Sequence, residues 1–444
     1  MSNHSIATQP EIDESESGRF HASTAYRKYV LILLLIVGIF NFVDRQILAI
    51  LLEPIKQDLH FSDTELGLLG GIAFALFNVI AGIPLAWLAD HYNRRNIIAI
   101  AVGVWSAMTA LCGMANGFVS LFLARVGVGI GEAGGGPPSQ SLISDYYAPE
   151  KRGTALAVLG TMFPLGGLAG FLIGGWMTQL YSWRAAFMVV GVPGIVLAFL
   201  VWLTLREPPR GHSENKEMDE TRLSMISMIG YFAKNRSFRH LCFAGALFGV
   251  SAWGGTIWVP AFFMRVHGMS PAAVGTWLAL IIGSAGVIGT LLGGSLADRV
   301  AKAKNDQRWY VWISSISLFV AIPFAFITFT WPTPEPALLC MIFPMLLANV
   351  FIGPTLAMLQ GLAGVKRRAM ASAMYVLLNN LIGMGLGPLA VGVISDIFTK
   401  EYGVDALRYS ILSMIVVVNV WASIHFFLSG RTLREDLALA DKDI

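Results

Sequence analysis

The sequence predicts an all-α membrane protein whose twelve transmembrane helices form two pseudo-symmetric six-helix bundles. Three observations support this prediction: the composition, the spacing of the apolar segments and the distribution of Lys and Arg. Of the 444 residues, 55% are hydrophobic and only 13% are charged, whereas soluble domains carry about 25% charged residues. The chain has too few polar residues to cover a large soluble core, so we expect its outer surface to face lipid.

Twelve segments are apolar and long enough to cross a bilayer, which takes roughly 20 residues in a helix. Backbone groups exposed to lipid must be hydrogen-bonded within the protein, so we expect helices. The sequence lacks the short alternating segments typical of a β-barrel. The predicted spans are residues 29–52, 65–89, 96–115, 118–142, 153–179, 184–206, 238–264, 272–297, 309–330, 337–362, 369–396 and 406–429.

The longest connection between spans falls halfway along the chain, so the spans divide into two groups of six. The second part of this connection, residues 225–238, has the pattern of an amphipathic helix on the inner membrane surface. The predicted organisation is a disordered cytoplasmic tail (1–28), a first bundle (29–206), a cytoplasmic linker (207–237), a second bundle (238–429) and a cytoplasmic tail (430–444).

The basic residues predict the orientation. If the N-terminus is cytoplasmic, 24 of the 31 Lys and Arg residues lie on the inner side, five on the outer side and two within spans. This asymmetry follows the positive-inside rule and places both termini in the cytoplasm, which requires an even number of spans. No long outer loop is present to carry glycans, so we expect a multi-pass protein of a plasma membrane, in particular a bacterial inner membrane.

Four charged residues lie deep within predicted spans: Asp44, Arg45, Arg125 and Glu132. Charges at this depth are costly and usually functional. Arg125 and Glu132 are seven residues apart and share a helix face, with Glu132 about 10 Å nearer the cytoplasm. We expect Asp44 or Glu132 to bind a proton, and Arg45 or Arg125 to exchange a carboxylate for a substrate anion. The alternative is a static set of ion pairs that holds two helices together.

Two inner loops have similar sequences at equivalent places in the two halves. Residues 86–95 read Ala-Trp-Leu-Ala-Asp-His-Tyr-Asn-Arg-Arg, and residues 294–299 read Gly-Ser-Leu-Ala-Asp-Arg. Both resemble the signature loop of the major facilitator superfamily, although Ala86 and Asn93 replace glycines. An Asp at the inner end of a helix can meet a helix dipole or a basic residue and latch the inner side. The predicted cytoplasmic gate comprises Asp90, Arg94, Arg95, Asp298 and Arg299.

A narrower resemblance rests on four stretches, residues 42–45, 90–95, 128–133 and 387–396, which are similar to the Spinster branch of that superfamily. That branch carries lysolipids and sphingoid phosphates. The resemblance implies that the first and fourth spans line a central cavity and that two bundles rock about a midplane site. The glycines of residues 125–133 resemble the superfamily's motif in the fourth span and are expected to let helices approach closely.

The second half has no deep carboxylate. Its polar candidates for the substrate cavity are Trp253, Gln360, Asn379 and Asn380. A polar first half and an apolar second half suit an amphiphilic substrate, although Asn and Gln also commonly bridge helices.

Other chemistry is not indicated by the sequence. The three cysteines are isolated, and no metal-binding, nucleotide-binding or nucleic-acid-binding pattern is present, so we expect neither an enzyme nor a cofactor. The sequence therefore predicts a monomeric, proton-coupled transporter of amphiphiles such as lysophospholipids or sphingoid phosphates. Two alternatives remain: a proton-coupled transporter of small organic anions or hydrophobic drugs, and a membrane receptor without flux.

Overall fold

Twelve membrane spans form the molecule. The structure is a computed structural model that describes residues 22–209, 225–364 and 367–442. Within these ranges every regular element is a helix. Eleven helical segments are long and apolar enough to cross a membrane. The last, residues 370–440, contains the short turn η4 (Gly403–Asp405) and crosses twice, which confirms the prediction of twelve spans.

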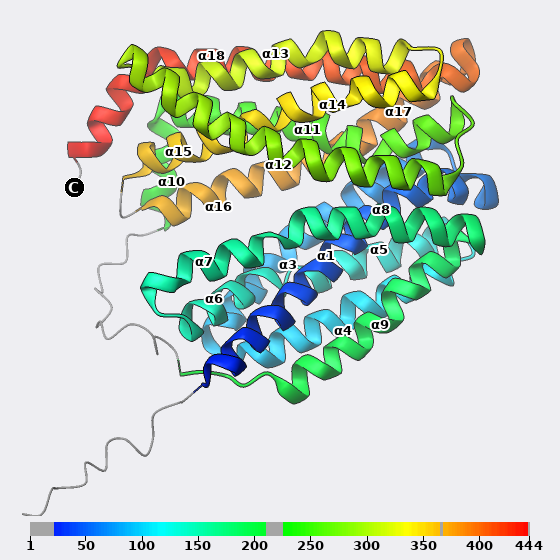
Figure 1. Cartoon of the computed structure of the whole chain (residues 1–444), viewed down its shortest axis with the longest axis horizontal. Helices are drawn as coiled ribbons and strands as arrows, with labels where there is room; N and C mark the ends of the chain where they lie inside the picture. Colours follow the sequence, from blue (N-terminus) through cyan, green and yellow to red (C-terminus); the bar gives the residue numbers. More distant parts are fainter. Residues whose placement is uncertain (1–21, 210–224, 365–366, 443–444) are drawn as a thin grey trace, which may run out of the picture.

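Six spans form the first half, in the lower part of Figure 1. Three of these spans are broken: the second at Gly71, the fourth after Glu132 and the fifth at Thr161. The helices are α1 (Thr24–Leu59), α2 (Asp63–Gly70) and α3 (Ile72–His91), α4 (Arg94–Gly113), α5 (Phe118–Glu132) and α6 (Gly136–Tyr146), α7 (Pro149–Gly160) and α8 (Met162–Leu180), and α9 (Trp183–Thr204).

The second half, in the upper part of Figure 1, repeats this pattern with differences. Its fourth span is also broken, at Phe351, as expected for internal repeats. Its fifth span contains the π-helix η3 (Asn379–Met384). The other helices are α11 (Arg236–Arg265), α12 (Pro271–Lys304), α13 (Arg308–Thr330), α14 (Pro334–Val350), α15 (Ile352–Ala363), α16 (Arg368–Leu378), α17 (Gly385–Tyr402) and α18 (Ala406–Lys442).

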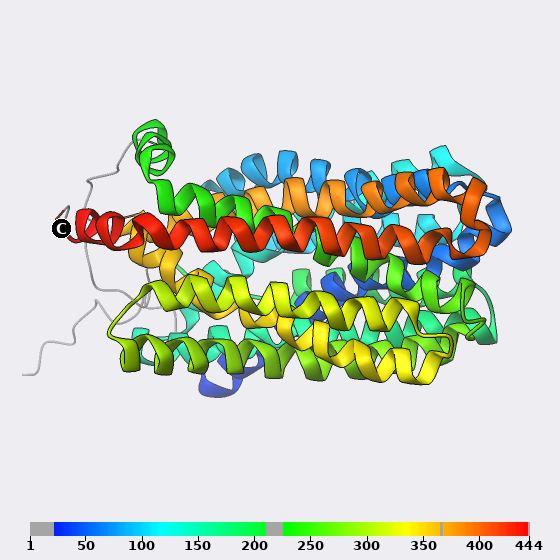
Figure 2. The ribbon, with the colours of Figure 1, turned by 90° about the horizontal axis from the view of Figure 1, so that it is seen from above.

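The described part of the linker contains one short helix, α10 (Met225–Lys234), which projects beside the start of α11 in Figure 2. This helix ends four residues before the predicted boundary because the Asn235 side chain caps α11, accepting a hydrogen bond from the Phe238 amide at 2.8 Å. The Phe232 ring stacks on Phe238 with centroids 4.3 Å apart. The linker helix is therefore fastened to the second half. Residues 210–224 lie outside the described residues.

The two predicted tails differ in what the structure describes. Most of the first, residues 1–21, lies outside the described residues, and α1 begins at Thr24. The second continues α18 as a helix to Lys442. Arg434 in this extension pairs with Asp306 at 3.0 Å, and Asp436 accepts a hydrogen bond from the Ser237 amide. This extension therefore packs on the second half.

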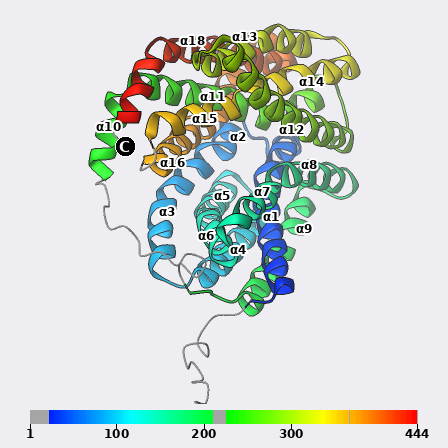
Figure 3. The same ribbon diagram turned by 60° about the vertical axis from the view of Figure 1, so that its left-hand side comes forward.

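The helices run roughly along the long axis of the molecule, and the described chain begins and ends at the same end, which we call the terminal end (Figures 1 and 2). We call the opposite end the distal end. Figure 3 shows the two halves one above the other, with α8 and α12 along their boundary. Among the described residues, every hydrogen bond and ion pair between the halves lies toward the distal end. The halves are therefore joined there.

Candidate functional site

The centre of the first half holds the four charged residues that the sequence singled out. Asp44 and Arg45 are consecutive on α1, so their side chains point about 100° apart around the helix. Asp44 is 1% exposed, and the Thr109 hydroxyl of α4 donates to both of its carboxylate oxygens, at 2.7 and 2.6 Å. Asp44 therefore joins α1 to α4.

Arg45 faces α5 instead, where its Nε donates to Glu132 Oε2 at 2.7 Å. The Glu132 side chain is fully buried, and that of Arg45 is 16% exposed. The sequence placed Arg45 and Glu132 in different spans and left open which of the buried charges pair. This buried, charge-assisted pair is the strongest contact of the central cluster.

Arg125 is the exceptional member of the cluster. It is 2% exposed, yet its Nε and Nη1 atoms have no hydrogen-bond acceptor among the described residues. Its Cζ atom lies 5.5 Å from the ring centroid of Phe74, which also lies 5.0 Å from Cζ of Arg45. A buried guanidinium with free N–H groups is costly. It is therefore suited to bind an anion.

A glycine explains how Phe74 enters this cluster. Gly129 lies between Arg125 and Glu132 on one face of α5. A Cβ atom at Gly129 would lie 2.6 Å from the Phe74 carbonyl oxygen, so only glycine lets α3 approach this closely. The Asn78 amide also donates to the Gly129 carbonyl at 3.0 Å. The glycine-rich motif of the fourth span therefore positions the site as well as packing it.

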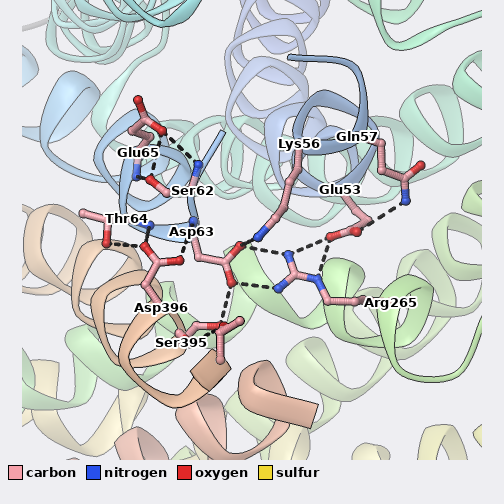
Figure 4. Close-up of polar contacts among 11 residues, drawn as sticks. Glu53, Lys56, Gln57, Ser62, Asp63, Thr64, Glu65, Arg265, Ser395 and Asp396 are labelled. Atoms are coloured by element: carbon pink, nitrogen blue, oxygen red, sulfur yellow. Dashed lines mark hydrogen bonds and ion pairs between the residues drawn. The ribbon is translucent and has the colours of Figure 1, made fainter. Parts of the chain in front are cut away.

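A second charged cluster joins the halves at the distal end (Figure 4). Arg265, at the end of α11, donates to Glu53 of α1 at 2.7 and 2.9 Å and to Asp63 of α2 at 2.7 and 2.9 Å. Lys56 also donates to Asp63, at 2.5 Å. The Asp63 side chain is fully buried. We call Glu53, Lys56, Asp63 and Arg265 the distal cluster.

Asp396 of α17 extends this junction (Figure 4). Its carboxylate accepts hydrogen bonds from the backbone amides of Asp63, at 3.0 Å, and Thr64, at 2.8 Å. It therefore caps the N-terminus of α2 from the other half of the molecule, where a negative charge is favoured. The neighbouring Ser395 donates to Asp63 at 2.6 Å.

The predicted gate residues make contacts within their own halves. Arg94 is buried and donates to Asp145 and Glu207, and the backbone amide of Arg95 also donates to Glu207. Asp298 accepts a hydrogen bond from Tyr310 at 2.6 Å. The two remaining predicted residues, Asp90 and Arg299, are exposed. In this conformation none of the five forms a described hydrogen bond or ion pair across the halves.

The four candidates of the second half lie in different settings. Asn379 donates to the Gly245 carbonyl at 2.9 Å and so bridges η3 and α11. Asn380 is half-buried in the same π-helix, an element that often marks functional sites. Trp253 is half-buried on α11, and Gln360 is exposed on α15.

Sequence reasoning missed Thr109, Phe74 and the distal cluster. Thr109 and Phe74 carry no charge, so nothing in the sequence separates them from ordinary packing residues. The distal cluster had a weak signal, because Lys56 and Arg265 are among only five basic residues on the predicted outer side. Among the described residues, no group of three or more His, Cys, Asp and Glu is arranged to hold a metal ion.

Comparison with known proteins finds similarity to membrane transporters. The sequence profile of the Major Facilitator Superfamily matches residues 34–388. An "MFS-type efflux pump" of Mycolicibacterium smegmatis is 32% identical over 97% of this chain and 98% of its own length. The "Sphingosine-1-phosphate transporter SPNS2" of Danio rerio is 26% identical over 83% of this chain and 76% of its own.

A solved structure is also similar along nearly the whole chain. It is described as a bacterial homolog of the human lysosomal transporter Spinster in an inward-facing and unoccupied conformation. The TM-score is 0.87 at 29% identity, with 94% of this chain and 99% of that chain covered.

Proposed function

Since the chain belongs to the Major Facilitator Superfamily, we propose that it is a proton-coupled transporter of anionic amphiphiles such as lysophospholipids or sphingoid phosphates. The observation that carries this proposal is the central cluster. It places a guanidinium with free N–H donors, Arg125, beside two buried carboxylates, Asp44 and Glu132. Its members are the charged residues that the sequence already favoured for transport.

The arrangement supports binding of a proton and an anion together. When Glu132 is ionised, it forms an ion pair with Arg45 at 2.7 Å, so the Arg45 guanidinium is not available to another anion. A proton on Glu132 removes this attraction and frees Arg45 to join Arg125 in binding a phosphate or carboxylate. Loss of the proton restores the ion pair and expels the anion. Proton binding and anion binding are coupled because the ionised Glu132 carboxylate and the substrate anion compete for the same guanidinium, that of Arg45.

The conformation supports alternating access. The halves are bonded to each other toward the distal end and not, among the described residues, toward the terminal end. We assign the terminal end to the cytoplasm of a bacterial cell, because the basic residues concentrate there. The structure then corresponds to the inward-facing state, as in the similar Spinster homolog. Transport requires the distal cluster to open and the terminal end to close.

The relatives support two substrate classes. The zebrafish relative is named for sphingosine-1-phosphate, which combines a phosphate with an alkyl chain. The mycolicibacterial relative is named as an efflux pump without a stated substrate, which is compatible with the alternative that this chain exports hydrophobic drugs. The free donors of Arg125 favour the anionic amphiphile, because a neutral or cationic drug leaves them unsatisfied.

Proteoliposomes that enclose a pH-sensitive dye test the proposal. We expect sphingosine phosphate or a lysophospholipid to drive proton flux, and Glu132→Gln to abolish it. Glu150→Gln is the matched control, because Glu150 is exposed at the start of α7 and should not affect flux. Flux with small organic anions or with drugs, but not with lipids, would assign the alternative substrate class. Ligand binding without any flux would support a receptor.

A further inference from the structure

The Phe74 side chain lies between the charged groups of two different helices. It is 1% exposed, and the guanidinium carbons of Arg45 on α1 and Arg125 on α5 lie 5.0 and 5.5 Å from its ring centroid. The face of an aromatic ring is electronegative and attracts cations within about 6 Å. Both central guanidinium groups are therefore held by one ring.

This contact is decisive for Arg125 but not for Arg45. Arg45 has a carboxylate partner in Glu132 and a second ring, Phe42, at 5.2 Å. Arg125, by contrast, forms no described ion pair: its Nε and Nη1 atoms have no acceptor among the described residues, and its guanidinium lies against the Phe74 ring.

Other partners are nevertheless near. Asp44, Arg45, Arg125 and Glu132 interact electrostatically with one another, and the Cys112 thiol of α4 faces the same cluster. The other helices packed on α1 and α5 carry their ionisable side chains near their ends, and α8 carries none. A guanidinium that lost its contact with the ring would be drawn toward these carboxylates by their opposite charge.

The position of the ring is set by backbone packing. The Phe74 carbonyl lies against Gly129, and Asn78, one turn further along α3, donates to the Gly129 carbonyl. Gly129 is four residues from Arg125 and three from Glu132, so the ring enters on the face that both side chains occupy. The ring therefore has a fixed place beside the guanidinium of Arg125.

We propose that Phe74 is a positioning residue that holds the Arg125 guanidinium apart from the buried carboxylates. It thereby keeps two N–H donors of Arg125 available to the anionic group of the substrate. The identity of that anion rests on the proposed function. The effect of the ring on the carboxylates does not depend on the proposed function, because it can be measured in the protein without substrate.

The test replaces Phe74 with mono-, di- and trifluorophenylalanine, which removes the electronegative face stepwise with little change in volume. The carboxylic acid band of the purified protein, assigned with Asp44→Asn and Glu132→Gln, is titrated by infrared spectroscopy. As the ring loses its attraction for the guanidinium, Arg125 moves toward a carboxylate and stabilises the charged form of that carboxylate. We expect the midpoint to shift to lower pH with each fluorine, by about three- to tenfold in proton concentration for the full series.

The control is the same series at Phe171, a fully buried ring of α8 that no arginine of the described residues contacts, where no shift is expected. A midpoint that stays constant across the Phe74 series, or that moves equally in both series, overturns the proposal. Sphingosine phosphate uptake by proteoliposomes is measured in parallel, and its KM should rise with fluorination. A shifting midpoint without any uptake would retain the role of Phe74 and reject the proposed transport.

Discussion

Replacing Arg265 by Met is expected to open the distal end of the molecule. Arg265 is the only side chain of the second half in the distal cluster, and it donates four hydrogen bonds to Glu53 and Asp63 of the first half. Methionine keeps much of the length and apolar surface but supplies neither charge nor donors. In Arg265→Met, the two carboxylates stay buried against each other for as long as the distal end stays closed.

The expected magnitude follows from burial. The Arg265 side chain is 13% exposed, and its partners Glu53 and Asp63 are 7% and 0% exposed. Removing one partner of a buried ion pair costs about 3–5 kcal/mol. Lys56 still pairs with Asp63 in the variant, so we expect the lower end of this range. About 3 kcal/mol raises the ratio of distally open to distally closed molecules by about a hundredfold.

Distances between two spin labels measure this ratio. Labels at Leu180→Cys, at the end of α8, and Val404→Cys, in η4, report on the distal ends of the two halves, and both positions are exposed. The three native cysteines are replaced first. The original chain should give one short distance, and Arg265→Met should add a longer one. Neutralising both acids as well, with Glu53→Gln and Asp63→Asn, should restore part of the closed population.

The matched control is Arg184→Met. Arg184 also lies at the distal end, but it contacts Asp58 and the Ala115 carbonyl within its own half. A distance distribution that Arg265→Met leaves unchanged, or that Arg184→Met alters to the same degree, would refute the reasoning that the distal cluster holds the halves together.

Three further predictions follow from single contacts. Asp396→Ala removes a charged acceptor from the N-terminus of α2, and the spin-label assay should show about a 30-fold rise in open molecules, for a loss of about 2 kcal/mol. Thr109→Val deprives Asp44 of its hydroxyl donor, so the proton binds more tightly and half-maximal proton flux should move up by about one pH unit. Hydrogen bonds from Arg308 hold the pKa of Asp306 below its ordinary value, so this contribution to stability is present above about pH 4 and is lost below it. Thermal unfolding of Asp306→Asn should therefore change less between pH 5 and pH 3 than that of the original chain, by less than about 1 kcal/mol.

The number and order of the spans could be predicted because lipid imposes a simple rule on the sequence. Each crossing needs a long apolar segment, and each inner connection collects basic residues. The breaks within spans could not be predicted in the same way. The span predicted over 118–142 carries no charged residue after Glu132, yet α5 ends there. Hydropathy does not record this break, which coincides with three consecutive glycines followed by two prolines at the start of α6.

The members of the central cluster could be predicted, but their pairing could not. Charge within a span is rare enough to identify Asp44, Arg45, Arg125 and Glu132 from the sequence alone. Whether Glu132 pairs with Arg45 or with Arg125 depends on how α1 and α5 are rotated, and no sequence rule gives that angle. The distal cluster could not be predicted, because charges near span ends are common. Little in the sequence therefore distinguishes Glu53, Asp63 and Arg265 from other charged residues at span ends.

The two clusters are connected through the second span. Its first piece, α2, carries Asp63 in the distal cluster, and its second piece, α3, carries Phe74 in the central cluster. The two residues are eleven apart, about 16 Å along a helix, and the break at Gly71 lies between them. A Cβ atom at Gly71 would lie 2.4 Å from the Gly385 carbonyl, so the break sits directly against the second half. The second span therefore contacts both clusters, and we expect that separating the distal ends also moves α3 and with it Phe74.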